Sequence, residues 1–220
     1  MFALWGEDLA TALHTSELRG TLAAAGGTRL QVNVDDAPVS RAMRIPSSGE
    51  PIGAIVSVWT SGDPTEVVAV LRALPARVAG WAVEERQPIM PPDTPDGERL
   101  DALVNVALIR RPDELTEQEW LHRWRVDHTP IAIETQATFG YVQNLVLEPV
   151  TDQAPPVSAL VEELFPTAGI DDLHAFYGSG GDDDELNARL TRLMASVTRI
   201  GADRGIDLVP TSRYVYDLSR

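Results

Sequence analysis

Apolar and polar positions along the chain predict the same order of elements in each half. Apolar residues recur at every second position in the segments predicted to be strands, and about every 3.6 positions in the segments predicted to be helices. In the first half the predicted strands are 2–5, 30–34, 52–59 and 78–87, and the predicted helices are 7–25 and 63–74. In the second half the strands are 103–109, 141–147, 158–165 and 214–216, and the helices start at 116, 171 and 184. Strand, helix, strand, strand, helix, strand is the ferredoxin-like order, given twice.

A proline-rich stretch separates the two halves. Residues 88–98 contain four prolines and no periodic pattern, which is typical of a linker. We therefore expect an α+β chain with a divergent ferredoxin-like half at 1–90, a linker at 91–100 and a second half at 101–220. A four-stranded antiparallel sheet with helices on one face leaves its other face apolar. The second four-stranded sheet can cover that face, which predicts two packed sheets and one barrel-like core within one chain.

The helix that starts near residue 116 carries the most distinctive side chains. Thr116 and Glu119 form a capping-box pattern, in which each side chain satisfies a backbone N–H at the start of a helix. Residues four apart share a helix face, so Trp120, Trp124 and His128 form one stripe. This stripe predicts an imidazole that faces the core beside two indoles.

The strand after this helix carries unusual polar groups. Pro130 disfavours helical geometry at the preceding residue, so the helix is expected to end or bend there. Tyr141, Gln143 and Asn144 follow on an otherwise apolar strand and need either hydrogen-bond partners or a cavity. On spacing alone, His128 is more often a core histidine bonded to a backbone carbonyl than a functional group. The polar strand beside it favours the functional interpretation.

Composition narrows the classes of function. The formal net charge of −15 would repel phosphate backbones, so no nucleic acid partner is expected. No apolar run reaches the roughly 18 residues that a membrane helix needs. The N-terminal sequence lacks the basic region of a signal peptide, so we expect a cytoplasmic protein with no membrane partner.

Two residue types are missing from the chain. There is no cysteine, which excludes disulfides, thiol nucleophiles and iron–sulfur clusters. All 18 basic residues are arginines, so Schiff-base chemistry and a P-loop lysine are excluded as well. Arginine-only basicity with abundant alanine suggests a GC-rich, bacterial genome.

The second half resembles a known family. Trp124, the D-H-T-P turn around His128 and the strand Tyr141-Val-Gln-Asn144 resemble the EthD-type domain of the dimeric α/β-barrel superfamily. The strand 158–165, with Glu162 near its middle, and residues 213–216 resemble further strands of that family. The resemblance covers residues 101–218. The first half resembles a divergent copy, in which His14 and Asn33 are the counterparts of His128 and Asn144.

The resemblance implies both a fold and a range of functions. It implies two sheets packed into a barrel, usually by two chains and here by the tandem halves, with a pocket between helices and sheet in each half. Members are associated with the degradation of small organic compounds and with polyketide tailoring. One fold of this kind hosts cofactor-free monooxygenases, isomerases, dehydratases and haem enzymes, so the reaction stays open.

The first hypothesis is an enzyme acting on a small hydrophobic, aromatic or polyketide-like compound without a bound cofactor. His128 would be the acid or base, because its ordinary pKa near 6.5 suits proton transfer near neutrality. Tyr141 and Asn144 would hold a carbonyl or enolate oxygen. The residues expected to bind the substrate are Trp120, Trp124, Glu162 and Tyr214. A cofactor-free oxidoreductase such as a monooxygenase, a dehydratase and a cyclase all fit these roles.

Other classes of function stay open. A non-catalytic ligand-binding or accessory protein would need the same pocket and no turnover. Haem binding would need an axial ligand, for which His128 or His174 could serve, but no haem motif supports it. The histidines lack paired metal-ligand spacing, so no metal site is expected. Any homodimer would use a surface outside the barrel, because the barrel-forming partner is expected to be internal.

Overall fold

The computed structural model describes residues 1–47 and 49–219, in which eight strands close into a single barrel. The order around the barrel is β1-β3-β2-β8-β5-β7-β6-β4, and all neighbours are antiparallel. The strands are β1 (Phe2–Trp5), β2 (Gly27–Val34), β3 (Ala54–Thr60), β4 (Arg77–Ile89), β5 (Leu103–Ile109), β6 (Gly140–Pro149), β7 (Ala159–Phe165) and β8 (Asp207–Asp217). Every strand expected from the sequence is present, and β8 starts seven residues earlier than the pattern indicated.

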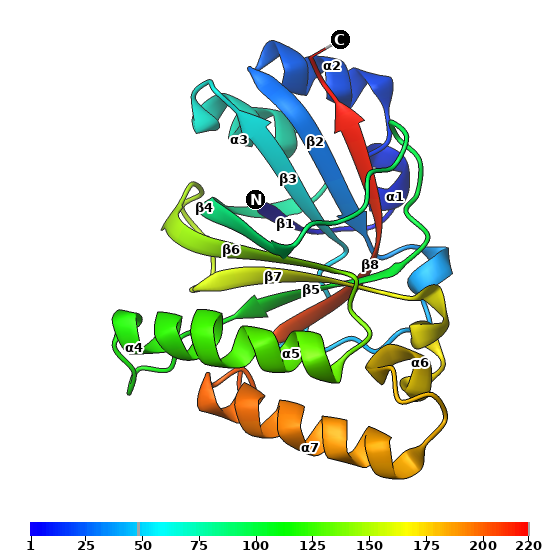
Figure 1. The fold of residues 1–220 in the computed structure, drawn as a ribbon. Helices are drawn as coiled ribbons and strands as arrows, with labels where there is room; N and C mark the ends of the chain where they lie inside the picture. The colour runs from blue at the N-terminus through cyan, green and yellow to red at the C-terminus, as the bar shows by residue number, and fades with distance from the viewer. Residues whose placement is uncertain (48, 220) are drawn as a thin grey trace.

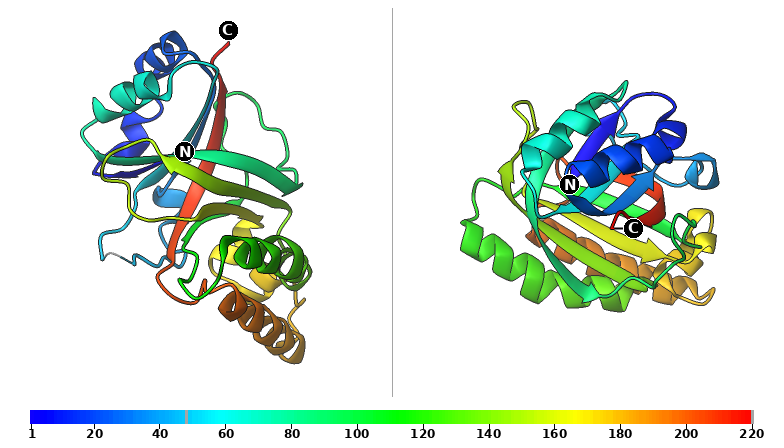
Figure 2. Two further views of the ribbon diagram at one scale, coloured as in Figure 1. Left: turned by 90° about the vertical axis from the view of Figure 1, so that its left-hand side faces the viewer. Right: turned by 90° about the horizontal axis from the view of Figure 1, so that it is seen from above.

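The expected barrel within one chain is present, but its two four-stranded sets are joined by hydrogen bonds into one wall rather than only packed against each other. Each half supplies four adjacent strands, but hydrogen bonds join the two sets at β2–β8 and at β4–β6. The long strands β4 and β8 make these joints. Residues 77–80 of β4 pair with β1 and residues 81–89 pair with β6, while β8 pairs first with β5 and then with β2. Figure 2 shows β8, in red, running past the strands of both halves of the chain.

Helices cover the barrel on two opposite sides (Figure 1). They are α1 (Leu9–Ala12), α2 (Ser16–Ala24), α3 (Pro64–Arg72), α4 (Glu117–His122), α5 (Thr129–Thr135), α6 (Leu173–Tyr177) and α7 (Asp183–Arg199), with short 3-10 turns at Ala37–Val39 and Thr167–Ile170. The first three lie on one side and the others on the opposite side. Separate apolar clusters fill the space beneath each group of helices, and a third cluster fills one end of the barrel interior. The expected capping box of Thr116 and Glu119 is present at the start of α4.

The sequence indicated that the helix ends or bends before Pro130, and the structure shows that it does not end there. A π-helical segment, η2 (Arg123–His128), joins α4 to α5, and Pro130 lies in the first turn of α5. Proline inside a helix normally clashes with the carbonyl four residues earlier. The wider π turn relieves that conflict, and the hydroxyl of Thr129 donates to the carbonyl of Trp124 at 2.9 Å.

Among the described residues, no helix combines the length and apolar character needed to cross a membrane.

Candidate functional site

His128, the last residue of η2, is buried on the outer side of the barrel and faces α7. It is 7% exposed, and its Nδ1 lies 2.9 Å from the hydroxyl Oγ of Ser196 on α7. Burial lowers the pKa of His128 to about 4, because the charged imidazolium loses its hydration. The imidazole is therefore neutral near pH 7 and has a hydrogen-bond partner in the helical layer.

The two indoles expected near His128 are also packed in this layer. Trp120 and Trp124 stack with ring centroids 5.0 Å apart, and both are almost completely buried. The indole N–H of Trp120 donates to the carbonyl of Ile200 at 3.1 Å. These contacts are those of a packed core between helices and sheet.

Strand β6 divides the polar residues that were expected to act together. Tyr141 packs with Trp120 and Trp124 in the outer cluster, and the Gln143 amide donates to the hydroxyl of Thr129 at 2.7 Å. Asn144 instead lines cavities in the barrel interior. Alternation along a strand places residues 141 and 144 on opposite faces because they are an odd number of positions apart. Their separation could have been read from the sequence.

The remaining predicted residues lie at two further places. Glu162 is inside the barrel and 2% exposed. Tyr214 is on the outer side of the first half, where its hydroxyl donates to Asp36 Oδ2 at 3.1 Å and its ring meets His14 edge-on at 4.4 Å between centroids. The seven predicted residues therefore do not surround one cavity, and their functional roles stay predictions.

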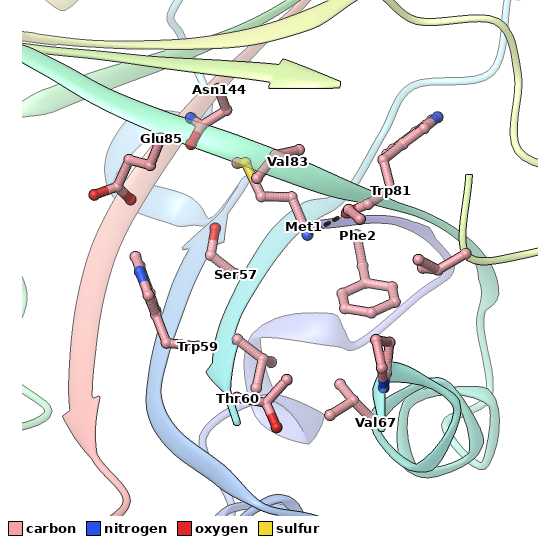
Figure 3. Close-up of a pocket in the computed structure, with 14 residues that line it drawn as sticks. Met1, Phe2, Ser57, Trp59, Thr60, Val67, Trp81, Val83, Glu85 and Asn144 are labelled. Carbon is pink, nitrogen blue, oxygen red and sulfur yellow. Dashed lines mark hydrogen bonds between the residues drawn. The ribbon is translucent and has the colours of Figure 1, made fainter. Parts of the chain in front are cut away.

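A cleft opens in the barrel wall between β3 and β4. The short β1 lies between these strands and pairs with both. Its last paired residue on this side is Phe2, which is opposite Val56 of β3 and Gly80 of β4. Beyond it β3 and β4 diverge, and a cavity of about 340 Å³ lies between them. Figure 3 shows the aromatic and aliphatic side chains of β1, β3, β4 and α3 around this space. Its lining includes Met1, Phe2, Ser57, Trp59, Val67, Trp81, Val83, Glu85 and Asn144.

Two buried polar side chains at this cleft have unused hydrogen-bonding atoms. Ser57 is 6% exposed, and its hydroxyl makes no hydrogen bond to any described residue. Asn144 is 3% exposed; its Nδ2 donates to the carbonyl of Leu160 at 3.2 Å, and its Oδ1 accepts nothing from the described part of the chain. Neither atom is sealed from solvent, so both can bind a ligand or water.

A smaller, polar cavity of about 150 Å³ continues from the cleft into the mouth of the barrel. Its floor is a buried ion pair: the Nε of Arg213 lies 2.9 Å from Glu162 Oε1, although the N–H is not aligned as a hydrogen bond. Gln31 donates to Glu162 Oε2 at 2.8 Å and accepts from Arg213 at 2.8 Å. Residues 90–94 of the linker cross the mouth of this cavity.

One titratable group outside the cleft was not anticipated. Glu163 is opposite Tyr141 in the β6–β7 ladder and points toward the helices. Burial of its carboxyl raises the pKa of Glu163 to about 7, although the residue as a whole keeps some solvent contact. In the sequence, the one sign that Glu163 is buried is that two apolar residues, Leu164 and Phe165, follow it.

The arrangement suits an organic ligand better than a metal. Among the described residues, no group of three or more histidine, aspartate or glutamate side chains could hold a metal ion. The two histidines considered for haem lie outside the cleft, and each ring Nδ1 meets a serine hydroxyl. The cleft offers indole faces, aliphatic walls and a few hydrogen-bonding groups, which is typical of a small-molecule site.

Two solved structures resemble the chain. An anthrone oxidase-like protein matches 100% of this chain and 92% of its own, with a TM-score of 0.52 and 11% sequence identity. A candidate monooxygenase from Lactobacillus acidophilus NCFM matches 99% of this chain and 95% of its own, with a TM-score of 0.47 and 9% identity. No family model and no curated protein matches the sequence. The first likeness shows a shared fold, and the assignments to the dimeric α/β-barrel superfamily and to its EthD-type domain stay predictions.

Proposed function

We propose that the protein binds a small, largely apolar organic compound in the cleft between β3 and β4. The cavity of about 340 Å³ carries this proposal, because its volume lies in the range of small-molecule sites. Trp59 supplies a flat surface for an aromatic ring, and the Ser57 hydroxyl with Asn144 Oδ1 supplies one donor and one acceptor for a hydroxyl group. A hydroxyl compound satisfies both features, and a carbonyl oxygen can accept from Ser57.

A second candidate function is transformation of that compound without a bound cofactor. Glu85 and Asn144 are direct partners in the β4–β6 ladder, and both line the cleft. A carboxylate there can take a proton from carbon next to a carbonyl, while the hydroxyl of Ser57 donates to the oxyanion that forms. In this proposal Glu85 takes the acid–base role first considered for His128, since His128 does not line the cleft.

Anthrone is a suitable first probe, because it is a flat aromatic ketone and the name of one structural neighbour contains it. Isothermal titration tests its binding, and chromatography after incubation in air tests conversion. Loss of a ring CH₂ proton to Glu85 would give the anthrone anion, and reaction with dioxygen would yield anthraquinone and water. Binding without product would favour a non-catalytic ligand-binding or accessory protein.

Matched variants locate the site. Val83→Trp fills the cleft and should abolish binding, whereas Val126→Trp adds the same bulk at a position that is 56% exposed on the outer helix. His128→Gln should leave binding unchanged. If Val83→Trp binds anthrone like the wild type while the His128 variant fails, the site lies in the helical layer and the cleft proposal is wrong.

A further inference from the structure

The cleft and the polar cavity share part of their walls. Both are lined by Ser57, Trp59, Glu85 and Asn144, so the two spaces adjoin at these side chains. One space is apolar and about 340 Å³, and the other is polar and about 150 Å³. Ser57 and Asn144, whose Oγ and Oδ1 make no hydrogen bond to a described residue, lie at the junction.

The polar cavity is already built before a ligand arrives. Glu162, Arg213 and Gln31 are each less than a tenth exposed and bind one another. Asn33 adds a hydrogen bond of 3.1 Å to Thr211, which in turn donates to the carbonyl of Val104 at 2.8 Å. Apart from the unaligned Nε–H of Arg213, these polar groups are paired, and a paired network holds its geometry and loses little freedom when a ligand binds.

The charged side chains around the polar cavity disfavour an anionic ligand, and the indole face that would bind a cation is already occupied. The charges of Glu162 and Arg213 neutralise each other. The other charged side chains that line the cavity are Arg29, Glu85 and Asp93. The guanidinium of Arg29 lies 4.4 Å from the centroid of the Trp59 ring and so occupies the indole face that a ligand cation would use. An anion would meet two carboxylates. A hydroxyl group can donate to a carboxylate and accept from a guanidinium or from Ser57.

We propose that the two spaces form one bipartite site for an elongated, uncharged compound, with its ring system in the cleft and a hydroxyl-bearing end in the polar cavity. This inference rests on the proposed function, because the cleft supplies the apolar half of the site. It deepens that function by naming the class of ligand: a neutral, hydroxylated aromatic or polycyclic compound. Ser57, Glu85 and Asn144 contact the middle of such a molecule.

A series of naphthalene compounds tests the polar end. The probes are 2-ethylnaphthalene, 2-(2-naphthyl)ethanol, 2-naphthylacetate and 2-(2-naphthyl)ethylammonium, which differ only in the end group. Isothermal titration should show all four in competition with anthrone. The alcohol should bind roughly five- to tenfold more tightly than the ethyl compound, as expected for one net hydrogen bond. The carboxylate and the ammonium compound should both bind more weakly than the alcohol.

A variant of the linker separates the two halves of the site. Thr94→Phe places a ring over the polar cavity without touching the cleft. It should remove the advantage of the alcohol and leave the affinity for 2-ethylnaphthalene unchanged. If 2-ethylnaphthalene does not bind the wild type, the proposed function fails. If it binds but the alcohol gains nothing, or if a charged end group binds most tightly, the bipartite site alone is overturned.

Discussion

Arg213 on β8 and Glu162 on β7 face each other inside the barrel, with Nε and Oε1 2.9 Å apart and side chains only 5% and 3% exposed. The strand β5 lies between β7 and β8 in the wall, so the pair bridges across it. Gln31 and Asn33 on β2 also donate to the Glu162 carboxylate. One buried carboxylate thus ties strands of both chain halves together at the floor of the polar cavity.

Removal of the charge at Glu162 should destabilise the fold strongly. Glu162→Gln leaves a buried guanidinium without its counter-ion, and breaking a buried pair in this way costs about 3 kcal/mol. Urea unfolding measures the loss. The matched control is Glu185→Gln, which breaks the exposed pair with Arg189 on α7 and should change stability by about 0.5 kcal/mol or less. Equal effects of the two substitutions would contradict a structural role for the buried pair.

His128 should make the protein less stable in mild acid. Its pKa falls from 6.5 to about 4 on folding, so the unfolded chain binds a proton at pH values where the folded chain does not. Stability from the neutral imidazole is complete above pH 6.5 and is lost as the pH falls toward 4, by about 2 kcal/mol between pH 7 and pH 5.

His128→Gln isolates this contribution, because an amide keeps a hydrogen bond to Ser196 and does not titrate. Unfolding free energies of the wild type and the variant are compared from pH 5 to pH 8. The wild type should lose more stability than the variant toward pH 5. Curves that run parallel would show that the imidazole is not protected from protonation.

Glu163 should have the opposite dependence on pH. Burial raises its pKa to about 7 from 4.5, so the folded chain keeps a proton that the unfolded chain has released. Stability from this group is complete below pH 4.5 and is lost as the pH rises through 7. Glu163→Gln removes the charge, and the variant should gain about 2 kcal/mol relative to the wild type between pH 5 and pH 8. A constant difference across that range would contradict the raised pKa.

The sequence predicts most elements of this fold because their signals are local. The capping box at Thr116 and the Asp63 cap of α3 are complete within four residues, and both are present. The length of β8 has no such signal. Pro210 interrupts its pattern, yet it lies opposite Asn105 at a position where β8 is about to change partner from β5 to β2. Which strand is paired at each point depends on residues more than a hundred positions away.

The candidate site was harder to predict than the fold. The functional expectation grouped residues that are close in sequence, such as His128 and Tyr141, whereas the cleft joins Ser57, Glu85 and Asn144 from three different strands. Nothing local indicates that β3 and β4 diverge beyond β1. The alternation of side chains along a strand places Asn144 and Tyr141 on opposite faces. This separation is the one feature of the site that could have been predicted from the sequence.

Gly80 on β4 sets the shape of the apolar cleft. A Cβ at this position would lie 2.3 Å from Cδ1 and 2.5 Å from Cε1 of Phe2, whose ring lines the cavity, and 3.0 Å from Val150. Gly80→Ala must therefore push the Phe2 ring out of place, and overpacking of this kind costs about 1–3 kcal/mol. The displaced Phe2 ring should also weaken the binding of anthrone, because this ring forms part of the cavity wall that the ligand contacts.

Gly20→Ala is the matched control for this last prediction. Gly20 lies in the middle of α2, where an added Cβ meets no atom within 4 Å. The same substitution there should stabilise the protein by about 0.5–1 kcal/mol, since alanine loses less backbone entropy than glycine in a helix. Urea unfolding and titration with anthrone are measured on both variants. Lower stability and weaker binding are expected for Gly80→Ala, with unchanged binding for Gly20→Ala. Wild-type affinity in Gly80→Ala would mean that the ligand does not contact Phe2, and the site would then have to lie farther along β4.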